Sequence, residues 1–130
     1  MASLNFKGKS AVWNHHLSVP YHTLDKDDKK SIKGDDESEN IVIEGDNLLA
    51  LKSLLPKYQG KVKCVYIDPP YNTGSRIDAD GKEIGYDDGL EHSEWLNMMK
   101  PRLEILRKLL TEDGSIYVSI DNTEVAYLLV

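Results

Sequence analysis

Cysteine and long apolar runs are nearly absent from this sequence. Its 130 residues include one cysteine, Cys64, which excludes an internal disulfide framework. Cys64 lies in an apolar segment, so we expect a buried small side chain and not a reactive thiol. No apolar run approaches the roughly 18 residues of a membrane span, and the start of the chain lacks the apolar core of a signal peptide. These absences predict a soluble protein of the reducing cytoplasm, with no membrane attachment.

Basic residues are also fewer than acidic residues in this sequence. The chain has 16 Lys and Arg against 22 Asp and Glu, which gives a formal net charge of −6. A complete DNA-binding enzyme is expected to carry a basic surface, and this balance argues against a strong one. The length corresponds to one domain at most.

The composition divides the chain into three parts. Residues 1–24 hold aromatic side chains and three histidines without clear periodicity, and we expect an irregular amino-terminal arm that packs on the domain. Because no cysteine or suitably spaced carboxylate accompanies the histidines, we predict no metal site. Residues 25–40 are rich in acids and lysines, as in a solvated charged linker. Residues 41–130 are expected to form the folded domain.

Residues 41–67 predict a strand, a helix and a second strand. The apolar residues 41–43 are expected to form a short buried strand. Leucines at helical spacing predict a helix over residues 47–58, and the apolar run 62–67 predicts the next strand.

A long loop and a long helix follow. Residues 72–92 exceed the usual connection length, and such loops are commonly functional or disordered. The helix is expected to begin near residue 93 or 94 and to stop at Gly114. Pro101 inside it costs about 3 kcal/mol and is expected to kink the helix or split it near Met99.

A third strand is expected over residues 115–120, and an acid three residues after Asp121 predicts the start of another helix. Alternating strands and helices with short connections imply an α/β fold with a parallel sheet and helices on both faces. This is half of a doubly wound, Rossmann-like nucleotide-binding fold. Three strands are few, so we expect the domain to be marginally stable alone.

The most informative motif is Asp68-Pro69-Pro70-Tyr71, placed directly after the predicted strand 62–67. The prolines fix φ near −65° and remove two N–H donors, so the chain leaves the strand as a stiff loop with free carbonyls. In an open α/β sheet, ligands bind beyond the carboxyl ends of the strands. The motif therefore predicts a ligand site at this edge.

Asp-Pro-Pro-Tyr resembles the signature of amino-group DNA methyltransferases that use S-adenosylmethionine. Three segments, residues 4–24, 45–74 and 94–128, resemble the modification subunits of type III restriction-modification systems. The resemblance covers nearly the whole chain apart from the charged linker. It implies a Rossmann-like methyltransferase fold, S-adenosyl-L-methionine as cofactor, and double-stranded DNA with a flipped target base as substrate.

The resemblance assigns the motif residues to catalysis. An adenine amine is a poor nucleophile, and it becomes positively charged as it takes a methyl group. The Asp68 carboxylate and the Pro69 carbonyl would accept hydrogen bonds from its two N–H groups, and Pro70 would stiffen the loop. Tyr71 would stack on the flipped base, although an aromatic packed under the loop is the structural alternative.

Further residues are expected near the site. Asp46 would lie beside the cofactor and accept from its adenosine amine, and it is equally placed to cap a helix. Asn72 and Thr73 are expected in the substrate loop, and Tyr86 is a candidate DNA contact. The roles of Ser119 and Asp121 stay open.

Two expected parts of such an enzyme are missing. The nine glycines include no closely spaced Gly-x-Gly pair after a strand, and no target-recognition region follows the motif. We expect the amino-terminal piece of a longer adenine-specific enzyme, inactive alone, whose partners are the rest of the methyltransferase and a restriction subunit. Methylation of the cytosine amine and a non-catalytic docking remnant are the alternatives.

Overall fold

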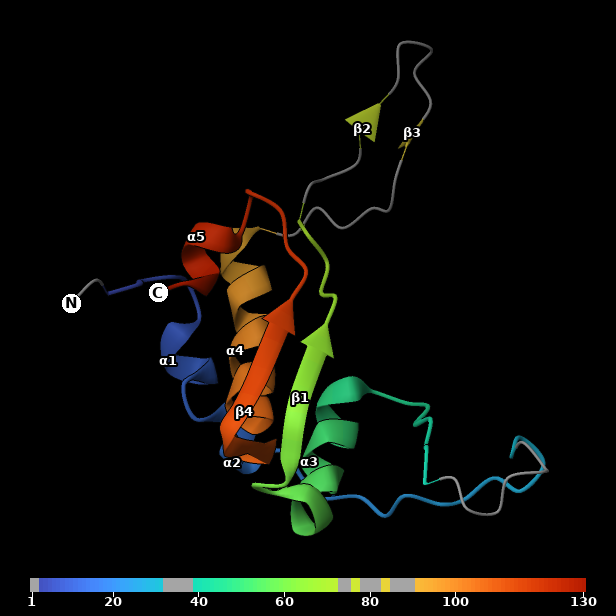
Figure 1. Cartoon of the computed structure of the whole chain (residues 1–130). Coiled ribbons are helices and arrows are strands. Elements are labelled where there is room, and N and C mark those ends of the chain that lie inside the picture. Colours follow the sequence, from blue (N-terminus) through green and yellow to red (C-terminus); the bar gives the residue numbers. More distant parts are fainter. Residues whose placement is uncertain (1–2, 32–38, 73–75, 78–82, 85–90) are drawn as a thin grey trace.

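The computed structural model of the protein has a pair of parallel strands, β1 and β4, with helices packed behind them (Figure 1). The structure describes residues 3–31, 39–72, 76–77, 83–84 and 91–130. Its elements in chain order are α1 (Lys9–Val12), α2 (His15–Ser18), α3 (Asn47–Tyr58), β1 (Val62–Ile67), β2 (Arg76–Ile77), β3 (Glu83–Ile84), α4 (His92–Leu109), β4 (Leu110–Val118) and α5 (Val125–Leu128). The short strands β2 and β3 form a separate antiparallel pair.

The helix α3 has the bounds that the leucine spacing predicts, and Asp46 sets its start. The Asp46 Oδ1 atom accepts hydrogen bonds from the backbone N–H groups of Leu48 and Leu49, at 2.9 and 3.1 Å. Such a cap satisfies donors that the first turn of a helix leaves free. The capping role foreseen for Asp46 is therefore confirmed.

The core lies between the sheet and the layer formed by α3 and α4 (Figure 1). Leu55 of α3 meets Ile105, Leu106 and Leu109 of α4, and apolar side chains of β1 pack against this cluster. A second cluster is centred on Trp95 and includes side chains of the arm and of the carboxyl-terminal residues. The helix α4 therefore joins the sheet, the arm and α5.

The expectation of helices on both faces of the sheet is wrong for the part of the chain that the structure describes. Strand side chains alternate between faces, and α3 and α4 cover only one of them (Figure 1). On the other face Tyr66 is 68% exposed, and its register partner Tyr117 is 60% exposed. Cys64 lies on this open face and is exposed, contrary to the prediction that it is buried.

Residues 41–43 do not form the expected strand. A strand needs a neighbour for its backbone N–H and C=O groups, and within the described ranges these residues have none. Val42 is 100% exposed and Ile41 is 60% exposed, so these apolar side chains are not buried in the core. The parallel sheet accordingly has two strands in the described chain, where the sequence predicts three.

The helix α4 ends at Leu109, earlier than expected, and is not split at Pro101, which is buried inside it. The next residue, Leu110, already belongs to β4. Gly114 also lies in β4, where a Cβ atom would stand 2.9 Å from the carbonyl oxygen of Val62. The glycine therefore permits a close approach of two backbones at a register shift, and does not end the helix.

The amino-terminal arm contains the one-turn helices α1 and α2, although its sequence predicts irregular structure. The buried Lys52 of α3 donates through Nζ to the carbonyl of His16 at 2.8 Å. Asn97 of α4 donates through Nδ2 to the carbonyl of Lys7 at 3.0 Å. These contacts join the arm to both long helices. A helix, α5, does follow Asp121, but it begins only at Val125, with Glu124 in the N-cap position, so the predicted cap at Asp121 is wrong.

Ile105→Ala should strongly destabilise the chain, because the Ile105 side chain is fully buried between α3 and α4. We expect the free energy of unfolding to fall by about 2–5 kcal/mol, measured by urea unfolding followed by circular dichroism. Leu129→Ala is the control, because Leu129 is 80% exposed and its truncation should change stability by only about 0.5 kcal/mol. Equal effects of the two substitutions would contradict this core.

Candidate active site

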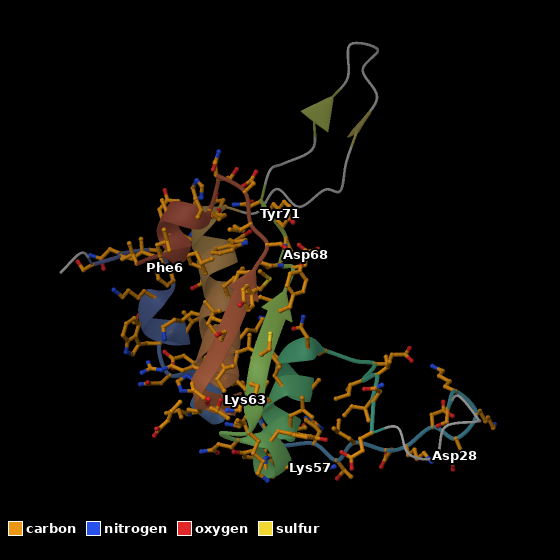
Figure 2. All side chains as sticks on the ribbon, in the orientation of Figure 1. Phe6, Asp28, Lys57, Lys63, Asp68 and Tyr71 are labelled. Carbon is orange, nitrogen blue, oxygen red and sulfur yellow. The ribbon has the colours of Figure 1, made fainter. Side chains whose placement is uncertain are left out.

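The motif loop, residues 68–72, projects from the carboxyl end of β1, beside the end of β4 (Figure 2). The backbone N–H of Ser119 donates to the carbonyl of Ile67 at 3.0 Å, so the strand ladder continues to the last residue before the motif. Asp68 is exposed, whereas Asn72 is 7% exposed. The motif thus starts from a fixed strand end, offers its carboxylate to solvent and returns into the protein.

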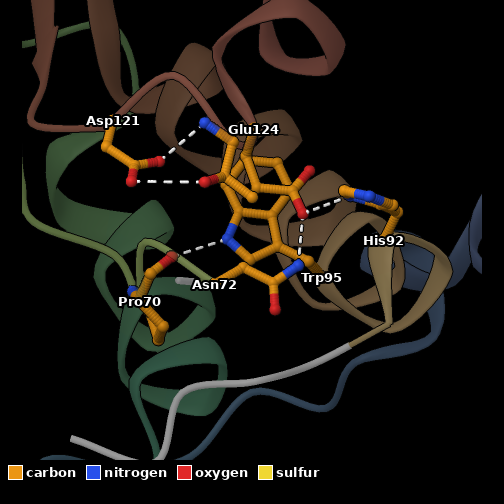
Figure 3. Close-up of polar contacts among 7 residues, drawn as sticks. Pro70, Asn72, His92, Trp95, Asp121 and Glu124 are labelled. Carbon is orange, nitrogen blue, oxygen red and sulfur yellow. Dashed lines mark hydrogen bonds and ion pairs between the residues drawn. The ribbon is translucent and has the colours of Figure 1, made fainter. Parts of the chain in front are cut away.

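Pro70 is anchored by its carbonyl group. The indole Nε1 of Trp95 donates to the Pro70 carbonyl oxygen at 2.7 Å (Figure 3). Trp95 is 1% exposed in the first turns of α4, so its orientation is fixed by packing. One of the carbonyls that the diproline leaves free is therefore used to hold the loop.

Asn72 is anchored by a buried carboxylate. Its backbone φ is 59°, in the left-handed region, which Asn tolerates better than most residues. Its side-chain Nδ2 donates to Oε1 of Glu124, and His92 Nδ1 lies 2.7 Å from the same oxygen (Figure 3). Glu124 is fully buried. Residues from the motif loop, the start of α4 and the start of α5 thus meet at one carboxylate.

The hydroxyl of Tyr71 interacts with the motif's own acid. A hydrogen bond with the Asp68 carboxylate raises the pKa of Tyr71 above its ordinary value, with a smaller contribution from desolvation, while a hydrogen bond with Ser119 acts in the opposite direction. Ser119 Oγ also lies 2.6 Å from the Tyr66 hydroxyl oxygen. Tyr71 therefore stays protonated at neutral pH. The hydroxyls of Tyr71, Ser119 and Tyr66 form a series of contacts that runs from Asp68 to the open face of the sheet.

Asp46 lies away from the motif loop in sequence, at the start of α3, and it is exposed. Among the described residues, the two hydrogen bonds that the Asp46 carboxylate accepts both end on Oδ1. Arg102 is nearby: its Nε donates to Asn47 Oδ1 at 2.7 Å. Burial lowers the pKa of Arg102, and the Asp46 charge partly opposes that shift. The capped helix start therefore still presents a carboxylate to solvent.

The remaining expected positions are only partly described. Thr73 and Tyr86 lie outside the residues that the structure describes. Asp121 accepts from the backbone N–H and the hydroxyl of Thr123, at 2.7 and 3.2 Å, and so shapes the turn before α5. In the described ranges, no three His, Cys, Asp or Glu side chains are grouped as a metal site would require. No helix in that part of the chain is both long and apolar enough to span a membrane.

Sequence reasoning missed three residues that hold the motif loop: His92, Trp95 and Glu124. The sequence pattern indicates no loop contact for Trp95, and for Glu124 it indicates only a helix start. Trp95 contacts Pro70 across 25 positions, Glu124 contacts Asn72 across 52, and His92 contacts Glu124 across 32, so no local pattern reveals these contacts. The available signal was an isolated acid, Glu124, directly before the apolar run 125–130.

Comparison with known proteins adds a family match. The DNA methylase family profile matches residues 62–130, from β1 and the motif loop to α5. The probable type III restriction-modification enzyme HindVI Mod subunit of Haemophilus influenzae is 53% identical over 91 residues, covering 70% of this chain and 11% of that protein.

Two further relatives support the match. The type III restriction-modification enzyme EcoP15I Mod subunit of Escherichia coli is 36% identical over 152 residues, covering 97% of this chain and 23% of that protein. The type II methyltransferase M.EcaI of Enterobacter cloacae is 42% identical over 81 residues, covering 62% of this chain and 18% of that protein. The chain thus spans less than a quarter of the length of each of these relatives.

Proposed function

We propose, for a chain that belongs to the DNA methylase family, that it forms the catalytic-motif part of an adenine-specific DNA methyltransferase. The observation that carries the proposal is the position of Asp68, an exposed carboxylate held at a fixed strand end in the Asp-Pro-Pro-Tyr loop. Relatives named as modification subunits support the assignment to a restriction-modification system.

The motif residues would act on the amine of a flipped adenine. Asp68 would accept one amine hydrogen and stabilise the positive charge that develops on the nitrogen, and the Pro69 carbonyl would accept the other. The Pro70 carbonyl is already bonded to Trp95, which leaves the Pro69 carbonyl as the acceptor next to Asp68. Tyr71 would provide a stacking surface for the extruded base. Asn72 and Thr73 would follow along the substrate loop.

S-adenosyl-L-methionine is the methyl donor that this chemistry requires, and when bound it would supply an electrophilic methyl group on a sulfonium. Asp46 fits a cofactor contact because its capping bonds use one carboxylate oxygen and the residue stays exposed. That arrangement leaves Oδ2 to accept a hydrogen bond from the adenosine part of the cofactor. Capping of α3 and cofactor binding are therefore compatible at Asp46.

The proposal extends to the organisation of the whole enzyme. Residues 41–130 would be part of a Rossmann-like catalytic domain, preceded by the arm, residues 1–24, and the linker, residues 25–40. Its partners would be double-stranded DNA, the remaining methyltransferase segments and a restriction subunit, and it would act in the cytoplasm. The parallel pair of β1 and β4 joined through α4 supports a fold of this kind.

Digestion of DNA modified by the complete enzyme should yield adenine methylated on its exocyclic amine, and no methylated cytosine. The enzyme would be incubated with S-adenosylmethionine and mixed-sequence DNA, and the nucleosides separated by chromatography with mass detection. DNA incubated without the cofactor is the control. A dominant methylcytosine peak would replace adenine with cytosine as the substrate, and no methylated nucleoside at all would support a docking remnant.

A further inference from the structure

Glu124 contacts two residues that lie far apart in sequence and bracket the segment after the motif. Its Oε1 accepts from Nδ2 of Asn72, the last residue of the motif loop, and lies 2.7 Å from Nδ1 of His92, the first residue of α4. A single carboxylate oxygen therefore holds both sides of residues 73–91 (Figure 3).

The contacts of the buried Glu124 carboxylate contribute little to the stability of the fold. A fully buried carboxylate loses its hydration, and such groups rarely stabilise a protein better than apolar side chains of the same size. Within the described chain, Oε2 of Glu124 and Oδ1 of Asn72 are both buried without a hydrogen-bond partner. Stability alone does not explain this cluster, whereas a requirement for one geometry of the loop does.

The loop is held at two residues that flank Tyr71. On one side the Pro70 carbonyl is bonded to Trp95, and on the other Asn72 is bonded to Glu124. Asn72 must also keep its left-handed φ of 59°, which sets the direction in which the chain leaves the motif. With these two residues fixed, Tyr71 has little freedom, and Asp68 is fixed from the strand side by Ile67.

We infer that Glu124 is a positioning residue for methyl transfer, and that it acts by fixing Asn72 and thereby the motif loop. This inference rests on the proposed function. Glu124 itself is fully buried behind the loop and would not touch the base. Its effect should appear in the rate of the chemical step, because a displacement of about 1 Å at a reacting group can cost about 100-fold in rate.

The test compares Asn72→Gly with Glu124→Gln in the complete enzyme. Glycine adopts the left-handed backbone freely, so Asn72→Gly removes the amide contact without adding backbone strain. We expect its single-turnover rate to fall about 100-fold, while DNA and S-adenosylmethionine affinities stay within a few-fold. Glu124→Gln keeps the shape and the accepting oxygen, so it should retain the rate to within about tenfold. Thermal melting of each variant reports the effect on folding.

Asn97→Ala is the matched control, because Asn97 also donates a side-chain amide hydrogen bond to another segment, at Lys7, away from the motif loop. It should leave the single-turnover rate unchanged. If Asn72→Gly does not fold, Asn72→Asp replaces it: it keeps the size, but sets a second carboxylate against Glu124, and the same loss of rate is expected.

The outcomes separate the two proposals. An active wild-type enzyme with an equally active Asn72→Gly variant would overturn the positioning role alone. The positioning role would also be overturned if Asn72→Gly lost rate only in proportion to its loss of thermal stability, and Asn97→Ala lost as much rate. A wild-type enzyme that transfers no methyl group to DNA would overturn the proposed function, and the positioning role with it.

Discussion

Asp68→Ala should lower the rate of methyl transfer by the complete enzyme about 100- to 1,000-fold, while DNA affinity stays within a few-fold. The Asp68 carboxylate is exposed at a fixed strand end, so its removal leaves the loop anchors at Pro70 and Asn72 in place. What is lost is an acceptor aimed at charge that develops only in the transition state. A group of this type contributes about 3–4 kcal/mol, which corresponds to a rate loss of about 100- to 1,000-fold.

Single-turnover transfer of a tritiated methyl group, with DNA binding measured in parallel, tests this prediction. The control is Asp113→Ala: Asp113 is another exposed carboxylate, paired with Lys63 at 2.7 Å toward the start of β1. It should change neither rate nor affinity. Near-normal transfer by Asp68→Ala would remove Asp68 from catalysis, and a parallel loss of DNA binding would indicate that it acts in substrate binding.

Replacement of Tyr71 should distinguish its ring from its hydroxyl. If the ring stacks on an extruded base, Tyr71→Ala should lose about 1–3 kcal/mol of base binding, or about 5- to 150-fold, and Tyr71→Phe should keep most of the activity. The phenylalanine variant removes the contacts with Asp68 and Ser119 that displace the Tyr71 pKa, but it keeps the aromatic face.

Fluorescence of DNA with 2-aminopurine at the target position measures base extrusion, and single-turnover rates measure chemistry. Tyr21→Ala is the control, because Tyr21 is 60% exposed on the arm, where the centroid of its ring lies 4.8 Å from Nζ of Lys52. Equal losses in Tyr71→Phe and Tyr71→Ala would assign the function to the hydroxyl, and so to its contact with Asp68.

The features that sequence reasoning predicted well are those with local causes. The helix α3 is bounded by a capping Asp46 and carries leucines at helical spacing, so its limits can be read directly. The start of the motif loop follows from an apolar strand and two prolines, whose stereochemistry depends on no neighbour. The existence of α4 and α5 follows from similar local patterns.

The features that it missed depend on partners distant in sequence. Residues 41–43 have strand composition, but a strand forms only where another strand supplies hydrogen bonds. Gly114 looks like a helix end, yet its role is set by the carbonyl of Val62, far away in the chain. At the candidate site, the same limit explains why the sequence points to Asp68 and not to Glu124: Glu124 meets the motif loop through a contact that spans 52 positions.

The open face and outer edges of the sheet make it extensible. In the described chain, β1 and β4 pair only with each other, so each offers a free edge to which a further strand could be added. Such an addition would leave the packing of α3 and α4 on the covered face unchanged, and the anchors of the motif loop at Trp95 and Glu124 lie outside the sheet. Further strands could therefore be added at either edge of the sheet, and further helices could pack on its uncovered face, without displacing Asp68.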